Sequence, residues 1–197
     1  RERQNILIAG GTSTGKTTLA NALLAEIAAT GDRVLVLEDT VELQCAARDH
    51  VPLRTRQGVV SMTELVRSSM RLRPDRVIVG EVRGAEALDL IKVWGTGHPG
   101  GIATIHAGSA LGALLRLEQL ILEVAENPPR ALIAEAVNVV IHIAGRGRKR
   151  RIESIARVVG FDGAGYQLAD ALEAPFPELL SQSDLSSLSP DQPGELP

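Results

Sequence analysis

The sequence predicts an α/β domain: a mainly parallel central sheet with helices on both faces and antiparallel strands at one edge. Short, almost wholly apolar runs alternate with segments of helical period, which is typical of a layered α/β fold. Runs this short and this apolar suit strands that are buried on both faces of a parallel sheet. They occupy residues 5–9, 34–38, 76–80 and 101–106.

Apolar residues also recur at helical spacing. In residues 84–94, and again in residues 109–124, they share one face of a predicted helix. The first face holds Ala87, Leu88, Ile91 and Trp94, and the second holds Leu111, Leu114, Leu115, Leu117 and Ile121. The sequence thus supplies helices of the kind that connect parallel strands.

The pattern changes from about residue 137. Three runs, VNVVIHIAG, RIESIARVVGF and YQLAD, are separated by turn-forming or charged residues. They indicate antiparallel strands at an edge, the first joined to the second across RGRKR. From Pro175 the chain is rich in Pro, Ser, Asp and Gln, with little period. We therefore expect one domain over residues 1–172 and a disordered tail over residues 173–197.

Composition limits the classes of function. The chain has 197 residues, of which 44% are hydrophobic, enough for one well-buried domain. Its net charge of −3 argues against a domain whose whole surface binds nucleic acid. Cys45 is the single cysteine, so no internal disulfide can form and a reducing, cytoplasmic compartment is favoured. No run approaches the roughly 20 apolar residues of a transmembrane helix.

A glycine-rich loop follows the first predicted strand and precedes a helical pattern. It fits the spacing G-x-x-x-x-G-K-S/T, which predicts a phosphate-binding loop whose N–H groups surround a nucleotide. Lys16 would reach the β- and γ-phosphates, the Thr17 hydroxyl would ligate Mg²⁺, and Thr18 would lie near the α-phosphate. The predicted nucleotide-binding residues are Gly10, Gly11, Thr12, Ser13, Thr14, Gly15, Lys16, Thr17 and Thr18.

Acidic residues follow the second predicted strand. Glu38, Asp39 and Glu42 come at its carboxyl end, beside the crevice where α/β sheets bind ligands. They can hold the waters of a metal or orient an attacking water, and position favours such a role for Glu38 and Asp39. The alternative is a solvated strand end.

A second strand end, RPDRVIVGEVRG, carries Glu81. P-loop proteins commonly end this strand with an aspartate that helps hold Mg²⁺, but Gly80 stands there. Glu81 is therefore the best candidate to polarise the water that attacks the γ-phosphate. Arg83 can pair with Glu81, with a phosphate, or in a structural salt bridge.

A third strand end carries His106, whose imidazole could sense or stabilise phosphate charge. A satisfied core histidine is the alternative on position alone. His98 lies in the turn GTGHPGG and is the poorer candidate. Arg116, in the following helix, can be a surface residue or face the site.

Four stretches taken together resemble a known family. GGTSTGKT, VLVLEDTVEL, RPDRVIVGEVRG and GTGHPGGIATIHAGS are similar, in order and spacing, to the Walker A, Asp-box, Walker B and His-box motifs of the secretion and traffic ATPases. These are the hexameric RecA-like motors of type IV and type II secretion and of type IV pili. The resemblance covers residues 5 to about 170, and it is strongest to the conjugal-transfer branch, the TrbB-type ATPases.

The resemblance implies a RecA-like P-loop core that hydrolyses ATP with Mg²⁺. It places Lys16 and Thr17 on ATP and Mg²⁺, Glu38 in the Asp box, Glu81 as the catalytic glutamate and His106 as the His-box residue. It also implies a homo-hexamer in the cytoplasm, held peripherally at the inner membrane by the secretion or conjugation machinery that it powers. An upstream N-terminal domain, which supplies arginines in this family, is absent from this chain.

Two other functions stay open at the level of the sequence. RGRKRR, residues 146–151, has five basic residues in six, so a RecA-like motor or loader acting directly on DNA is the alternative. Such a turn is more often solvated, and of the aromatic residues only Phe161 and Tyr166 are nearby. A P-loop kinase would need a lid and an acceptor site.

Overall fold

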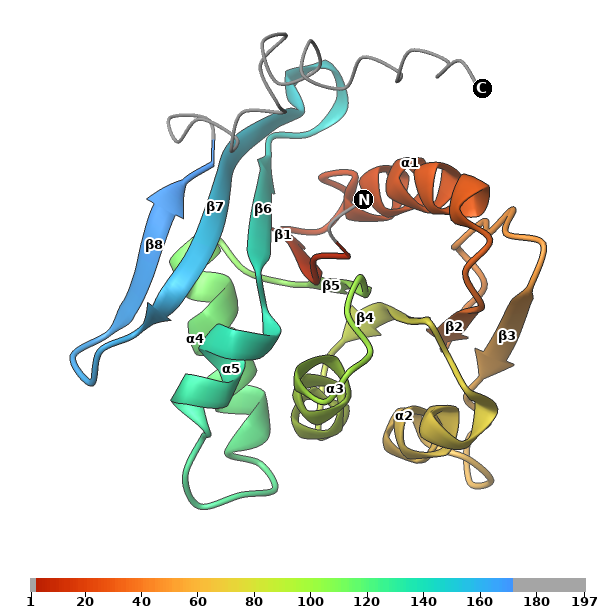
Figure 1. Cartoon of the computed structure of the whole chain (residues 1–197). Coiled ribbons are helices and arrows are strands. Elements are labelled where there is room, and N and C mark those ends of the chain that lie inside the picture. The colour runs from red at the N-terminus through yellow and green to blue at the C-terminus, as the bar shows by residue number, and fades with distance from the viewer. Residues whose placement is uncertain (1–2, 172–197) are drawn as a thin grey trace, which may run out of the picture.

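One eight-stranded sheet organises the chain in the computed structural model, which describes residues 3–171 (Figure 1). The strand order is β3-β2-β4-β5-β1-β6-β7-β8, with β7 and β8 antiparallel and the other pairings parallel. The strands are β1 Ile6–Gly10, β2 Val34–Glu38, β3 His50–Arg54, β4 Arg76–Val82, β5 Ile102–Ile105, β6 Val139–Ala144, β7 Arg151–Phe161 and β8 Tyr166–Asp170.

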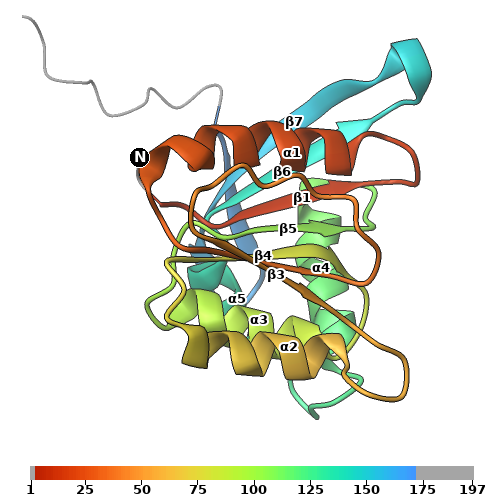
Figure 2. The same ribbon diagram turned by 90° about the vertical axis from the view of Figure 1, so that its right-hand side faces the viewer.

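Helices cover both faces of the sheet. Helix α1 lies on one face, and α2, α3, α4 and α5 lie on the other (Figure 2). The helices are α1 Lys16–Ile27, α2 Met62–Ser69, α3 Glu86–Gly95, α4 Ala110–Ile121 and α5 Arg130–Ala136, with short 3-10 turns at Ala28–Thr30, Met70–Leu72 and Gly147–Lys149. None of the described helices is long and apolar enough to cross a membrane.

The predicted parallel strands are confirmed, and their side chains alternate between two cores. Leu7 of β1 packs on the side of α2 to α5, whereas its neighbour Ile8 packs with Leu24 of α1. All five residues of β2 are buried. Burial on both faces explains why these strands appear in the sequence as continuous apolar runs.

Two expectations about strands were wrong. β6 is not purely antiparallel, because it pairs in parallel with β1 and antiparallel with β7. β3 was missed altogether. It lies at the edge of the sheet, contains Pro52, and exposes every second residue, so it has no apolar run that the sequence could reveal.

The face predicted for α4 was too wide. Leu114, Leu117 and Ile121 are buried, but Leu111 and Leu115 are 43% and 45% exposed. The buried stripe has the spacing i, i+3, i+7, and the two exposed leucines lie around the helix from it. In α3 the prediction holds, since Ala87, Ile91 and Trp94 are buried. The disorder predicted for residues 173–197 concerns residues outside those described.

The entry to β5 is closely packed against α3. Nε1 of Trp94 donates to the carbonyl of Val77 at 3.2 Å, directly over Gly101. A Cβ added at Gly101 would lie 2.1 Å from Nε1 of Trp94 and 2.7 Å from the Val77 oxygen. Both neighbours are buried, so the glycine is required here by space.

Gly101→Ala should therefore lower the free energy of unfolding by about 3 kcal/mol, because the indole or the strand must shift. Gly160→Ala in β7 is the matched control, since an added Cβ there meets no atom within 4 Å. Urea unfolding followed by circular dichroism measures both. Equal stability of the two variants would contradict the packing argument.

Candidate nucleotide-binding site

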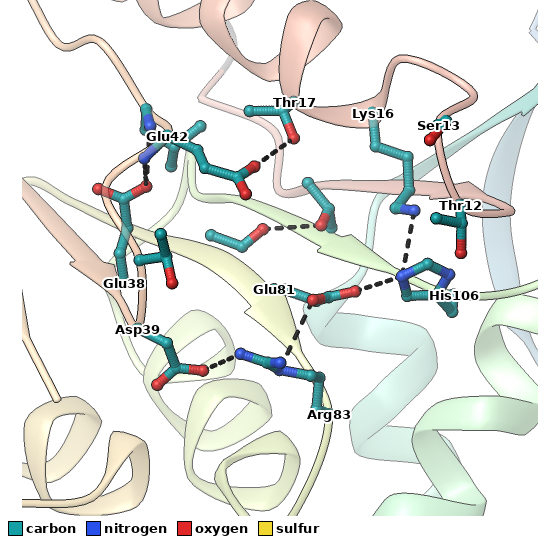
Figure 3. A pocket seen from close by; sticks show the side chains of 14 residues that line it. Thr12, Ser13, Lys16, Thr17, Glu38, Asp39, Glu42, Glu81, Arg83 and His106 are labelled. Atoms are coloured by element: carbon teal, nitrogen blue, oxygen red, sulfur yellow. Dashed lines mark hydrogen bonds and ion pairs between the residues drawn. The ribbon is translucent and has the colours of Figure 1, made fainter. Parts of the chain in front are cut away.

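The parallel strands end at one edge of the sheet, and a cavity of about 390 Å³ opens there (Figure 3). It gathers side chains from the loop after β1 and from the ends of β2, β4 and β5. The lining residues are Thr12, Ser13, Lys16, Thr17, Glu38, Asp39, Thr40, Glu42, Leu43, Gly80, Glu81, Arg83, Thr104 and His106. The four stretches that predicted the site thus meet in one place.

The glycine-rich loop has the backbone that an anion site needs. Gly15, at φ 99°, is the N-cap of α1, and no side chain caps that helix. The first N–H groups of α1 are therefore left for an anion, with the helix dipole behind them. Gly10 has no space for a side chain, because an added Cβ would lie 2.6 Å from both the Ile143 carbonyl oxygen and Oγ1 of Thr14.

Lys16 is buried at the start of α1 and points across the loop. Its Nζ donates to the carbonyls of Gly10 and Gly11 at 3.0 and 3.1 Å. Burial lowers the pKa of this ammonium, and the carboxylates of Glu81 and Glu42 oppose that shift. The cation is held by backbone oxygens that a phosphate could replace.

Thr17 meets an acidic residue from the segment after β2. Its hydroxyl donates to Oε2 of Glu42 at 3.0 Å. Hydroxyl and carboxylate oxygens are the ligands that Mg²⁺ and its waters prefer. This pair therefore fits the metal that the phosphate loop implies. Glu42 was one of three acids marked in the sequence, but nothing there singled it out as the partner of Thr17.

Glu38 is buried and anchors the segment that follows it. Its Oε1 accepts hydrogen bonds from the backbone N–H groups of Glu42 and Leu43 at 3.0 and 2.8 Å. A Cβ added at Gly80 would lie 3.1 Å from Cγ of Glu38. An aspartate at position 80 would thus crowd Glu38 and place a second carboxylate beside it, which explains the glycine there.

Glu81 is turned into the cavity by an irregularity of β4. The register between β4 and β5 shifts between Val79 and Val82, and the Thr104 hydroxyl donates to the Gly80 carbonyl at 2.7 Å. Such bulges re-aim side chains at sites. The sequence could not show this shift, because it depends on pairing with β5.

Glu81 lies between an imidazole and a guanidinium. Its Oε1 is 2.6 Å from Nε2 of His106, out of line for a hydrogen bond, so this buried oxygen has no hydrogen-bond donor among residues 3–171. Nε of Arg83 is 3.5 Å from Oε2. His106 also lies 3.5 Å from Nζ of Lys16, which makes it a bridge between the loop and Glu81.

Other candidates have different partners. Asp39 pairs with Arg83 and accepts a hydrogen bond from Thr55 at 2.6 Å, so it holds the rim of the cavity. Arg116 donates to Gln119 on the surface of α4. His98 bonds the Pro74 carbonyl and lines a separate hollow. Of the predicted phosphate-loop residues, Gly10, Gly11, Thr14, Gly15 and Thr18 do not line the cavity.

Residues 1–154 match the family described as Type II/IV secretion system protein. The chain belongs to this family. The conjugal transfer protein TrbB of Rhizobium radiobacter is 52% identical over 167 residues, which cover 84% of this chain and 51% of that protein. The type IV secretion system protein PtlH of Bordetella pertussis is 39% identical over 166 residues, 76% of this chain and 49% of that protein.

A solved structure of the same family shares the fold. The VirB11 ATPase from the Brucella suis type IV secretion system, in complex with sulphate, has a TM-score of 0.72 and 34% identity, and covers 79% of this chain and 48% of that one. The secretion-ATPase resemblance of the four motifs is thereby confirmed. The chain spans about half the length of the curated relatives that it matches.

In this member of the secretion family, Glu38 should contribute mainly to stability. Glu38→Ala leaves two buried N–H groups without an acceptor and should lower the free energy of unfolding by about 3 kcal/mol. Glu38→Gln keeps an oxygen in place and should cost about 1 kcal/mol. Urea unfolding of the two variants tests this, and equal losses would show that Oε1 does not anchor the segment.

Proposed function

We propose that this chain is the hydrolytic core of a Mg²⁺-dependent ATPase that powers conjugal DNA transfer or type IV secretion. One observation carries the proposal: a single cavity gathers the phosphate loop, the Thr17 hydroxyl and the buried carboxylate of Glu81. Family membership supports the same activity, because the matched VirB11 protein is described as an ATPase.

Each side chain has a role in binding and hydrolysis. Lys16 leaves the carbonyls of Gly10 and Gly11 and pairs with the β- and γ-phosphates, while the N–H groups at the start of α1 bind the phosphate oxygens. Thr17 and Glu42 would hold Mg²⁺ and its waters. When bound, Mg²⁺ neutralises charge on the β- and γ-phosphates.

Hydrolysis joins a water oxygen to the γ-phosphorus and breaks the bond from that phosphorus to ADP. Glu81 accepts the proton of the attacking water, since its free oxygen is buried at the cavity wall. His106 touches both Glu81 and Lys16, so it would respond to a γ-phosphate placed between them. Arg83 keeps the Glu81 carboxylate oriented.

The working unit that we propose is larger than this chain. It is a homo-hexamer in the cytoplasm that associates with inner-membrane secretion or conjugation machinery. Support comes from the descriptions of the relatives as conjugal transfer and type IV secretion proteins. An upstream N-terminal domain would supply further arginines to the phosphates, as the resemblance implies.

Lys16→Ala should weaken ATP binding by roughly 100-fold or more, because the cation that faces the β- and γ-phosphates is lost. Calorimetric titration with ATP measures the change. Lys92→Ala is the control, since Lys92 is exposed on α3. Wild-type affinity in the Lys16 variant would refute the phosphate-loop assignment.

Glu81→Gln should separate binding from turnover. The loop and Lys16 are intact, so ATP binds as before, but kcat should fall on the order of 10²-fold or more because the base is gone. Phosphate release measures turnover, with Glu123→Gln on the surface as the control. An unchanged kcat would remove Glu81 from the mechanism.

A further inference from the structure

The turn between β6 and β7 leaves the sheet beside the phosphate loop. β6 runs parallel to β1 and pairs Ile143 with Gly10, so both strands end at the same edge. The turn projects beyond the sheet at that edge (Figure 2). It consists of residues 145–150 and contains most of the basic run that had no role in the site described above.

The course of this turn is narrowly determined. Gly145 has φ 79°, and a Cβ there would lie 2.1 Å from the Lys149 carbonyl oxygen. The N–H groups of Lys149 and Arg150 donate to the carbonyls of Arg146 and Gly147 at 3.1 and 3.4 Å, closing a 3-10 turn. The backbone of the turn thus sets where the Arg150 side chain begins.

Arg150 lies against the phosphate loop. A Cβ added at Gly15 would be 3.5 Å from Cδ of Arg150, 3.6 Å from its Nη1 and 3.9 Å from its Nε. Gly15 is the N-cap of α1, so the guanidinium lies at the positive end of that helix. The neighbouring Arg151 pairs with Glu153 at 2.8 Å, but Arg150 has no carboxylate partner in residues 3–171.

A guanidinium in this position needs an anion. It lies beside uncapped N–H groups and close to a buried lysine, which repel it unless negative charge is shared between them. Lys16 points the other way, toward Gly10, Gly11 and His106. The two cations therefore approach the loop from different sides.

We propose that Arg150 is a nucleotide-binding residue that pairs with the α- and β-phosphates from the β6–β7 turn. Lys16 serves the β- and γ-phosphates from the opposite side. The planar guanidinium can give two parallel N–H donors to phosphate oxygens, and Gly15 leaves the space that this approach requires. The inference rests on the proposed function, because it presupposes a nucleotide on the loop.

The test uses the protein at its natural full length. Arg150→Gln should weaken binding of ATP and of ADP by about tenfold each, because both carry the α- and β-phosphates. Arg148→Gln is the matched control: it removes the same charge from the same turn and should change either affinity less than twofold. Arg150 is exposed, so unchanged thermal unfolding is expected in both variants.

Three outcomes overturn the inference. If Arg150→Gln binds both nucleotides normally while Lys16→Ala does not, Arg150 has no role and the proposed function stands. If Arg148→Gln and Arg150→Gln weaken binding equally, diffuse charge is responsible. If Arg150→Gln loses only salt-dependent DNA binding, the turn serves nucleic acid. Failure of the proposed function is recognised separately, since Lys16→Ala would then bind ATP like the wild type.

Discussion

The buried side chain of Asn5 sets the register of the three central strands. Its Oδ1 accepts from the N–H of Gly101 before β5, and its Nδ2 donates to the Ala136 carbonyl before β6 at 2.7 Å. Its own N–H donates to Oδ1 of Asn138. One amide thus fixes the starts of β1, β5 and β6, and a slip of one residue would turn every side chain to the other face.

The site at the far end of these strands depends on that register. Gly10, His106 and Ala144 lie about one strand length beyond the Asn5 contacts, on β1, after β5 and on β6. The loop, the imidazole that bridges to Glu81 and the turn that carries Arg150 are therefore placed by backbone pairing. Side chains positioned by a sheet keep the geometry that binding and hydrolysis require.

Local signals were enough for much of this arrangement. The phosphate loop announces itself through glycine spacing after a buried strand, and Glu81 and His106 through their places at strand ends. The pairing of Thr17 with Glu42 and the approach of Arg150 to Gly15 join residues 25 and 135 positions apart. They depend on tertiary packing, as does the mixed pairing of β6, and no local pattern carries that information.

The cations of the cavity are held differently, and this decides what a nucleotide must displace. Lys16 is bound to two carbonyls, and Arg83 to Asp39 and Glu81. A phosphate gains a contact with either of them only by replacing an existing one, so each contributes a difference between two interactions. Arg150 has no such internal carboxylate among the described residues. A phosphate beside Gly15 would therefore gain its attraction without breaking an ion pair.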